Sequence, residues 1–310
     1  MSKLRTVFMG TPDFAVGCLQ VMHEKTEVLM VVTQPDRPKG RGHKLTPSPV
    51  KVQALEYGLP VWQPEKIKTA DCVAKLQELN PDLIVVVAFG QILSQEILDI
   101  PRLGCVNVHA SLLPRYRGAA PIHWSIINGE TETGVTTMLM DAGLDTGDML
   151  LKSKTVITPD MTTEELHDKL AEMGSALLAD TVDGLTVGTI KGEKQDDSLS
   201  NYASMLTKET AHIDWRKTAQ EVHNLVRGLN SWPVAWTMAG DKNCKVWQTR
   251  VLDNVSGAPG EVVEIKNKSF VVAAGNGGVE ILEIQPPSKK RMPAGDFARG
   301  NGIKLGMIFN

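Results

Sequence analysis

The side chains with the most evident chemical potential are those of Asn107 and His109, in the segment NVHASLLP. They are two positions apart in an apolar run, residues 105–109, that is typical of a strand, so their side chains share one face. An amide and an imidazole on one face can polarise a carbonyl and move a proton. The alternative is a histidine satisfied by a backbone partner near a turn, and the pair alone does not decide between the two.

Three acids lie close together in the glycine-flanked segment DAGLDTGD, which follows another apolar run and covers residues 141–148. Their spacing differs from that of an EF-hand calcium loop. One of these acids can orient His109, as acids do in many catalytic sites, or the segment can be a solvated turn. The four cysteines are scattered without a C-x-x-C pair, which argues against zinc and against a disulfide framework. We expect no metal.

A loop rich in proline and glycine, residues 34–49, follows an earlier apolar run. A sixteen-residue loop inside a compact domain tends to be functional. It has one acid, and its basic residues suit contact with phosphate, although a solvated surface loop is the competing interpretation. The basic residues are Arg37, Lys39, Arg41 and Lys44.

Elements that position these residues alternate between short apolar runs and helical patterns. The alternation predicts an α/β fold with a mostly parallel, Rossmann-like sheet, in which ligands lie beyond the carboxyl ends of the strands. Neither a G-x-G-x-x-G nor a G-x-x-x-x-G-K-[ST] motif is present, which excludes dinucleotide and P-loop binding. The predicted strands are 6–9, 28–33, 83–88, 105–109 and 134–140, and the predicted helices are 13–23, 49–57, 69–79 and 162–185.

The pattern changes after the last of these helices, whose start carries a capping box of Thr162 and Glu165. A polar stretch without apolar period is followed by one helical segment, 214–229, and then by short β runs separated by turn residues. This spacing predicts a small OB-like β-barrel. We therefore expect a catalytic domain over 1–190, a linker over 191–207 and a second domain over 208–310.

Composition limits the classes of function. The chain has 310 residues, 42% of them hydrophobic, and a net charge of −3, so the whole chain is not a basic nucleic-acid binder. No apolar run approaches the ~20 residues of a membrane span, and no signal peptide is visible. We expect a cytoplasmic protein with no membrane partner. No apolar heptad suggests a dimer seam, and we expect a monomer.

At these motifs the chain resembles the methionyl-tRNA formyltransferases, over essentially its whole length. The resemblance lies in MGTPDF at 9–14, TQPDRP at 33–38 with the following GRG, NVH at 107–109, SLLPRYRGAAPI at 111–122 and GLDTGD at 143–148. The SLLP segment with the upstream N-x-H and the downstream aspartate is shared by enzymes that use 10-formyltetrahydrofolate. The basic loop and the β-rich C-terminal module point to the tRNA-directed member.

The resemblance implies a catalytic trio of Asn107, His109 and Asp145. It implies transfer of a formyl group from 10-formyltetrahydrofolate to the α-amine of charged initiator methionyl-tRNA, with the basic loop, and Arg41 in particular, at the tRNA acceptor end. The folate-binding residues that it implies are Phe89, Gly90, Ile92, Ser111, Leu112, Leu113 and Pro114.

For this reaction we expect Asn107 and His109 to donate to the oxyanion that forms as the amine attacks the formyl carbon. His109 can also move the proton, with Asp145 holding the imidazole. Alternatives are a formyltransferase for a small amine, a formyl-folate hydrolase, and a catalytically silent RNA-binding protein.

Overall fold

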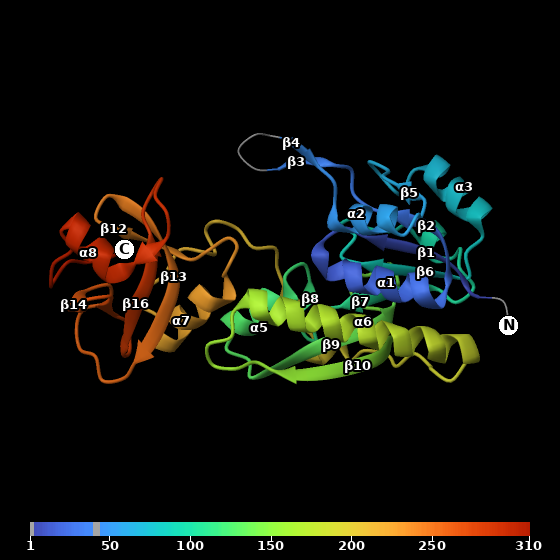
Figure 1. Cartoon of the computed structure of the whole chain (residues 1–310). Helices are drawn as coiled ribbons and strands as arrows, with labels where there is room; N and C mark the ends of the chain where they lie inside the picture. Colours follow the sequence, from blue (N-terminus) through green and yellow to red (C-terminus); the bar gives the residue numbers. More distant parts are fainter. Residues whose placement is uncertain (1–2, 40–43) are drawn as a thin grey trace. The chain divides into compact units, whose positions relative to one another are not determined.

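The computed structural model describes residues 3–39 and 44–310, which form two compact units (Figure 1). The first unit comprises Met1–Gly118, Thr133–Thr155 and His167–Tyr202, and the second comprises Ala119–Glu132, Val156–Leu166 and Ala203–Asn310. The sequence suggested one boundary near residue 190. Here the chain instead enters the second unit twice before its C-terminal third.

The first unit is built on a seven-stranded sheet with the order β10-β9-β7-β6-β1-β2-β5. The five strands from β7 to β5 run parallel, and β9 pairs antiparallel with β7. Unbroken apolar runs such as that of β6 suit a sheet buried on both faces. The strands are β1 (Arg5–Gly10), β2 (Glu27–Val32), β5 (Val61–Trp62), β6 (Leu83–Val87), β7 (Cys105–His109), β9 (Glu132–Leu139) and β10 (Met149–Val156).

Helices cover both faces of this sheet. On one face, α1 and α6 approach closely because Gly17 faces Ser175, and Gly174 of α6 lies on Val108 of β7. On the other face, α3 and α4 pack against the side chains of β1, β6 and β7. The predicted capping box is confirmed: Thr162 and Glu165 exchange hydrogen bonds at the start of α6. The helices are η1 (Asp13–Ala15), α1 (Val16–Lys25), α2 (Pro49–Glu56), α3 (Ala70–Leu79), α4 (Gln95–Leu98), α6 (Thr163–Val187) and η2 (Asp197–Leu199).

The basic loop contains structure that its composition did not reveal. Two short strands, β3 (Arg37–Lys39) and β4 (Lys44–Thr46), pair antiparallel as a hairpin. A second small sheet joins β8 (Arg117–Gly118) to β11 (Tyr202–Ala203).

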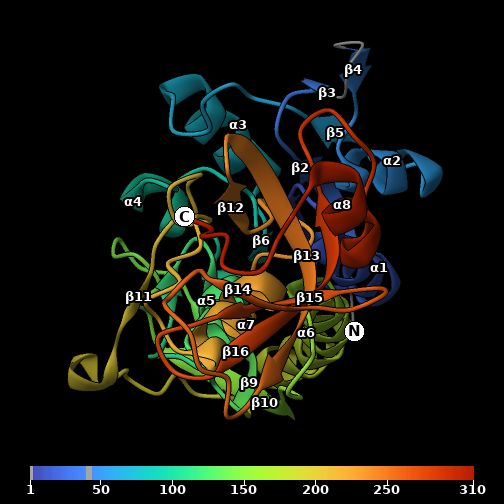
Figure 2. The same ribbon diagram turned by 90° about the vertical axis from the view of Figure 1, so that its left-hand side faces the viewer.

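The second unit is a curled antiparallel sheet with the order β12-β13-β16-β15-β14, and β17 pairs with β16 (Figure 2). Its edge strands are linked through the chain's last residues: Phe309 bridges to Ala239, and Ile308 bridges to Glu261. The prediction of a Rossmann-like domain followed by a small OB-like β module is confirmed. The elements are α5 (Pro121–Ile127), α7 (Ala219–Gly228), β12 (Trp236–Ala239), β13 (Lys242–Leu252), β14 (Val262–Ile265), β15 (Phe270–Ala273), β16 (Gly278–Gln285), β17 (Met292–Pro293) and α8 (Ala294–Asn301).

Helix α7 explains why two earlier segments belong to the second unit. Gly228 packs so closely on α5 that a Cβ there would lie 2.7 Å from Ile127. The buried guanidinium of Arg227 donates to the carbonyl oxygens of Thr158 and Met161, at 3.3 and 3.0 Å. The predicted helix over 214–229 begins later, at Ala219, because Thr218 and Glu221 form a second capping box.

Candidate functional site

Asn107 and His109 lie on β7 at the edge of the sheet where the parallel strands end. Their side chains share one face of β7, and Val108 points to the opposite face, where it meets α6. Val86 of β6 is in register with Asn107. The spacing of the two polar residues on a strand is therefore confirmed.

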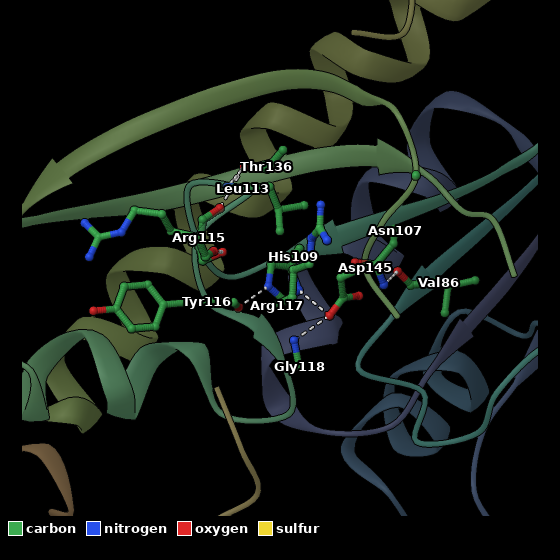
Figure 3. A network of polar contacts seen from close by, with 12 residues as sticks. Val86, Asn107, His109, Leu113, Arg115, Tyr116, Arg117, Gly118, Thr136 and Asp145 are labelled. Atoms are coloured by element: carbon green, nitrogen blue, oxygen red, sulfur yellow. Dashed lines mark hydrogen bonds and ion pairs between the residues drawn. The ribbon is translucent and has the colours of Figure 1, made fainter. Parts of the chain in front are cut away.

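The His109 imidazole is buried, and each ring nitrogen faces an oxygen (Figure 3). Nε2 lies 2.9 Å from the carbonyl oxygen of Tyr116, and Nδ1 lies 3.7 Å from Oδ2 of Asp145. A carbonyl oxygen only accepts, so Nε2 carries a hydrogen in this arrangement. A proton added at Nδ1 then faces a carboxylate. Each ring nitrogen is thus oriented by an oxygen of the protein.

Asp145 reaches His109 from the loop between β9 and β10. Its backbone has a φ of 54°, in the left-handed region, and its Oδ2 also accepts a hydrogen bond of 2.7 Å from the amide of Gly118. Gly147, two residues later, has no room for a side chain, because a Cβ there would lie 1.7 Å from the carbonyl oxygen of Leu139. The loop is therefore closely fitted to the end of β9. Among the described residues, no group of three or more His, Cys, Asp or Glu is arranged to hold a metal.

Gln195 secures this loop, a role that sequence reasoning missed. Its Nε2 donates to the carbonyl oxygens of Asp145 and Gly147, at 2.8 and 2.7 Å. Its Oε1 accepts from Nε and Nη2 of Arg117, at 3.0 and 2.8 Å. Gln195 lies in the polar stretch that was predicted to be a linker, where a single glutamine carries no pattern. Arg117, within the family motif, was the available clue.

The Asn107 side chain presents an acceptor. Its Nδ2 donates to the carbonyl oxygen of Val86 at 3.2 Å, and its buried Oδ1 has no partner among the described residues. A buried polar atom without a partner is costly, so such an atom at a strand end is expected to have a function. Oδ1 can accept a hydrogen from a ligand, and Nδ2 has a second N–H to donate.

The SLLP segment turns immediately after β7 and is pinned by Thr136 of β9. The Thr136 hydroxyl donates to the carbonyl oxygen of Ser111 at 2.7 Å and accepts from the amide of Leu113 at 3.1 Å. Ser111 and Leu113 are fully buried, whereas Leu112 and Pro114 are half-buried. The backbone of this segment is thereby fixed beside His109.

The segment after β6, like the SLLP segment, combines buried residues with more exposed ones. Phe89 is buried and packs in the core, whereas Gly90 is exposed and Ile92 is 79% exposed. The carbonyl oxygen of Phe89 accepts from Thr11 at 3.0 Å and from Gln34 at 3.1 Å. Phe89 therefore positions this segment through its backbone, and its ring lies inside the protein.

The basic residues of the loop lie on the hairpin. Lys39 and Lys44 are in β3 and β4, and Arg37 begins β3 with an exposed side chain. Arg41 lies outside the described residues. The structure thus brings Asn107, His109 and Asp145 together at the end of the sheet. Of the basic residues, the described ones, Arg37, Lys39 and Lys44, lie on a separate projecting hairpin (Figure 1).

Comparisons with known proteins agree with this architecture. Residues 4–182 match the family model described as formyl transferase, and residues 205–302 match that of the formyl transferase C-terminal domain. The structure resembles an N-formyltransferase from Helicobacter canadensis in complex with folinic acid and dTDP-3-aminofucose, with a TM-score of 0.68 at 21% identity over 91% of this chain and 98% of that one. It also resembles HypX from Aquifex aeolicus in complex with tetrahydrofolic acid, with a TM-score of 0.64 at 16% identity over 98% of this chain. The chain spans about half of HypX, 48% of its length.

Sequence relatives are similar over their full length. A methionyl-tRNA formyltransferase from Geobacter metallireducens is 53% identical over 99% of this chain and 100% of the relative. One from Ruminiclostridium cellulolyticum is 52% identical over 98% of each chain. The chain belongs to the methionyl-tRNA formyltransferase family.

Proposed function

We propose that Asn107, His109 and Asp145 perform the reaction of this family. The formyl group of 10-formyltetrahydrofolate is transferred to the free α-amino group of methionyl initiator tRNA, which yields formylmethionyl-tRNA for translation initiation. The observation that carries the assignment of residues is the arrangement at the end of β7. There a buried imidazole lies between a carbonyl oxygen and the Asp145 carboxylate, beside an amide oxygen that has no partner within the described chain.

Asn107 aligns the nucleophile in this proposal. The α-amine must be unprotonated to attack, and it then has two N–H groups and one lone pair. Oδ1 of Asn107 accepts one N–H and so directs the lone pair at the formyl carbon. The second N–H on Nδ2 faces the negative charge that develops on the formyl oxygen, a contribution of about 3 kcal/mol per donor in related sites.

His109 and Asp145 manage the proton that the amine loses on attack. His109 Nδ1 has a lone pair in the neutral ring, because Nε2 donates to Tyr116. Protonation at Nδ1 creates an imidazolium whose charge the Asp145 carboxylate stabilises. The same imidazolium returns a proton to the departing N10 nitrogen.

The formyl donor is consumed in the reaction and is therefore a second substrate. Exposure divides its proposed binding residues into two groups. Gly90, Ile92, Leu112 and Pro114 are exposed or half-buried and contact the donor directly in this proposal. Phe89, Ser111 and Leu113 are buried, and they fix the backbone that carries the other four.

The tRNA meets the β3–β4 hairpin through Arg37, Lys39 and Lys44, and Arg41 of the same loop contributes as well. Their charge suits phosphate, and the hairpin keeps them on a projecting element.

Among the described residues, no helix is both long and apolar enough to cross a bilayer. We place the enzyme in the cytoplasm, as a monomer.

The first experiment mixes the purified protein with 10-formyltetrahydrofolate and initiator methionyl-tRNA, and separately with elongator methionyl-tRNA. Formylmethionine released from each tRNA is measured. We expect formylation of the initiator alone. Consumption of folate on a small amine or on water, without formylated tRNA, would retain the trio and overturn the acceptor. Replacing Arg37, Lys39 and Lys44 by Gln raises KM for the tRNA and leaves KM for the donor unchanged.

A further inference from the structure

Gln34 connects the segment after β6, which is proposed to bind the folate, to the β3–β4 hairpin, which is proposed to bind the tRNA. It is the second residue after the end of β2 and is half-buried. Its side-chain Nε2 donates to the carbonyl oxygen of Phe89 at 3.1 Å, and its own backbone oxygen accepts from Nε2 of Gln63 at 2.8 Å. Phe89 begins the segment that carries Gly90 and Ile92, and Gln34 leads into the hairpin.

On the folate side, the Phe89 peptide depends on these contacts for its orientation. Ala88 and Gly90, on either side of it, have φ angles of 46° and 85°. A residue with a side chain, such as Ala88, rarely adopts a positive φ unless surrounding contacts hold it there, whereas a glycine adopts it freely. Thr11 and Gln34 hold the carbonyl between them. A ligand that orders Gly90 and Ile92 therefore also orders the acceptor of Gln34.

On the hairpin side, a set of polar contacts fixes the root of β3. Asp36 accepts from Nζ of Lys51 at 2.7 Å and from Nε2 of Gln63 at 2.8 Å. The hydrogen bonds from Lys51 and Gln63 lower the pKa of the Asp36 carboxyl, so it stays ionised at neutral pH. Gln63 thus links Asp36, the residue immediately before the hairpin, to the backbone of Gln34.

We propose that Gln34 is a positioning residue that couples the two substrates, so that a bound folate tightens the binding of methionyl-tRNA. The inference rests on the proposed function. The links run from Phe89 through Gln34 and Gln63 to Asp36. Filling the folate site restricts this chain of contacts, and the tRNA then binds a hairpin whose root is already ordered. Linkage requires that the tRNA tighten folate binding by the same factor.

The experiment measures the dissociation constant of initiator methionyl-tRNA with and without saturating 5-formyltetrahydrofolate, an isomer without a formyl group on N10. In the wild type we expect the folate to tighten tRNA binding by about fivefold, at the lower end of known coupling strengths. The quantity compared is the ratio of the dissociation constant without the other ligand to that with it. The reciprocal titration, of folate with and without tRNA, must give the same ratio.

Three variants test the route. Gln34→Glu keeps the size of the side chain and removes the donor to Phe89, so the ratio falls to about one. Gln63→Ala breaks the link at a residue whose side-chain hydrogen bonds within the described chain go to Gln34 and Asp36, and its ratio also falls to about one. Gln53→Ala is the matched control. Gln53 is on neighbouring α2, and its side chain donates to Glu56 and to no other described residue. The ratio of this variant stays at the wild-type value.

If Gln34 had a purely structural role, Gln34→Glu would weaken tRNA binding equally with and without folate. The ratio of the two dissociation constants would then stay at the wild-type value, and this result would overturn the proposal. A ratio of one in a wild type that formylates initiator tRNA would also overturn it, while the proposed function stands. A wild type that does not formylate the tRNA overturns both. Thermal unfolding of each variant verifies that it is folded during the titrations.

Discussion

Replacement of Asp145 by Asn tests how much the carboxylate contributes to the reaction. The amide keeps an oxygen for the Gly118 N–H and removes the charge that faces Nδ1 of His109 across 3.7 Å. Two unit charges at that separation attract by about 4 kcal/mol at an effective permittivity near 20. Each 1.4 kcal/mol is a factor of ten in rate, and the imidazolium is only partly formed in the transition state. We expect kcat to fall by roughly 10² to 10³.

The assay is single-turnover formylation of initiator methionyl-tRNA at saturating donor, so that the chemical step is observed. Asp141→Asn is the matched control, because Asp141 is in the same loop and bonds Gly143 and Thr146 instead of His109. Its rate should remain within about threefold of the wild type. An Asp145→Asn variant that is folded and reacts within fivefold of the wild-type rate would refute the assigned role of the carboxylate.

Three further perturbations have defined outcomes. Gln195→Ala removes the donor to the carbonyl oxygens of Asp145 and Gly147, so kcat should fall at least about tenfold while tRNA affinity stays near normal. A kcat equal to that of the wild type in rapid-quench assays would contradict this role of Gln195. Burial and then the charge of Arg227 lower the pKa of His223 in the folded state, so stability is complete above the unfolded pKa near 6.5 and declines as pH falls below it. Urea unfolding at pH 7.5 and 5.5 should show a smaller loss for His223→Gln than for the wild type. Thr218→Ala removes the cap of α7 and should lower the free energy of unfolding by about 1 kcal/mol, measured in the same titration.

Much of the fold could be predicted because the pattern of apolar residues is local. The run at residues 105–109 is a strand with those same ends, and the start of α6 follows its capping box. The hairpin in the basic loop was missed because its strands have three residues each and include Pro38, which normally opposes strand formation. Short strands like these depend on pairing with each other, and a window along the chain does not show pairing.

The candidate site was predictable only in part, for a physical reason. Asn107 and His109 share a strand, so their spacing places them on one face. The residues left open whether one of the three acids at 141–148 meets His109, and only resemblance to the family singled out Asp145, because the approach spans two strands and a loop. Gln195 acts through hydrogen bonds to main-chain oxygens, which any residue offers, so its partners cannot be recognised from residue type. That Oδ1 of Asn107 has no partner in the described part of the chain likewise depends on which neighbour accepts from Nδ2.

The interleaved division of the chain has a consequence for its synthesis. The ribosome delivers residues 119–132 and 156–166 before the helix α7 on which they pack, so these two segments wait, unpaired, until residues 219–228 have been made. The first unit, by contrast, has every strand of its seven-stranded sheet once residue 156 has emerged, and Gln195, which holds the Asp145 loop, follows about forty residues later. Folding of the nascent chain should therefore proceed in an order that leaves both segments without their packing partner for a time. A chaperone that binds apolar chain would then meet the apolar residues of the first segment, such as Ile122 and Ile126.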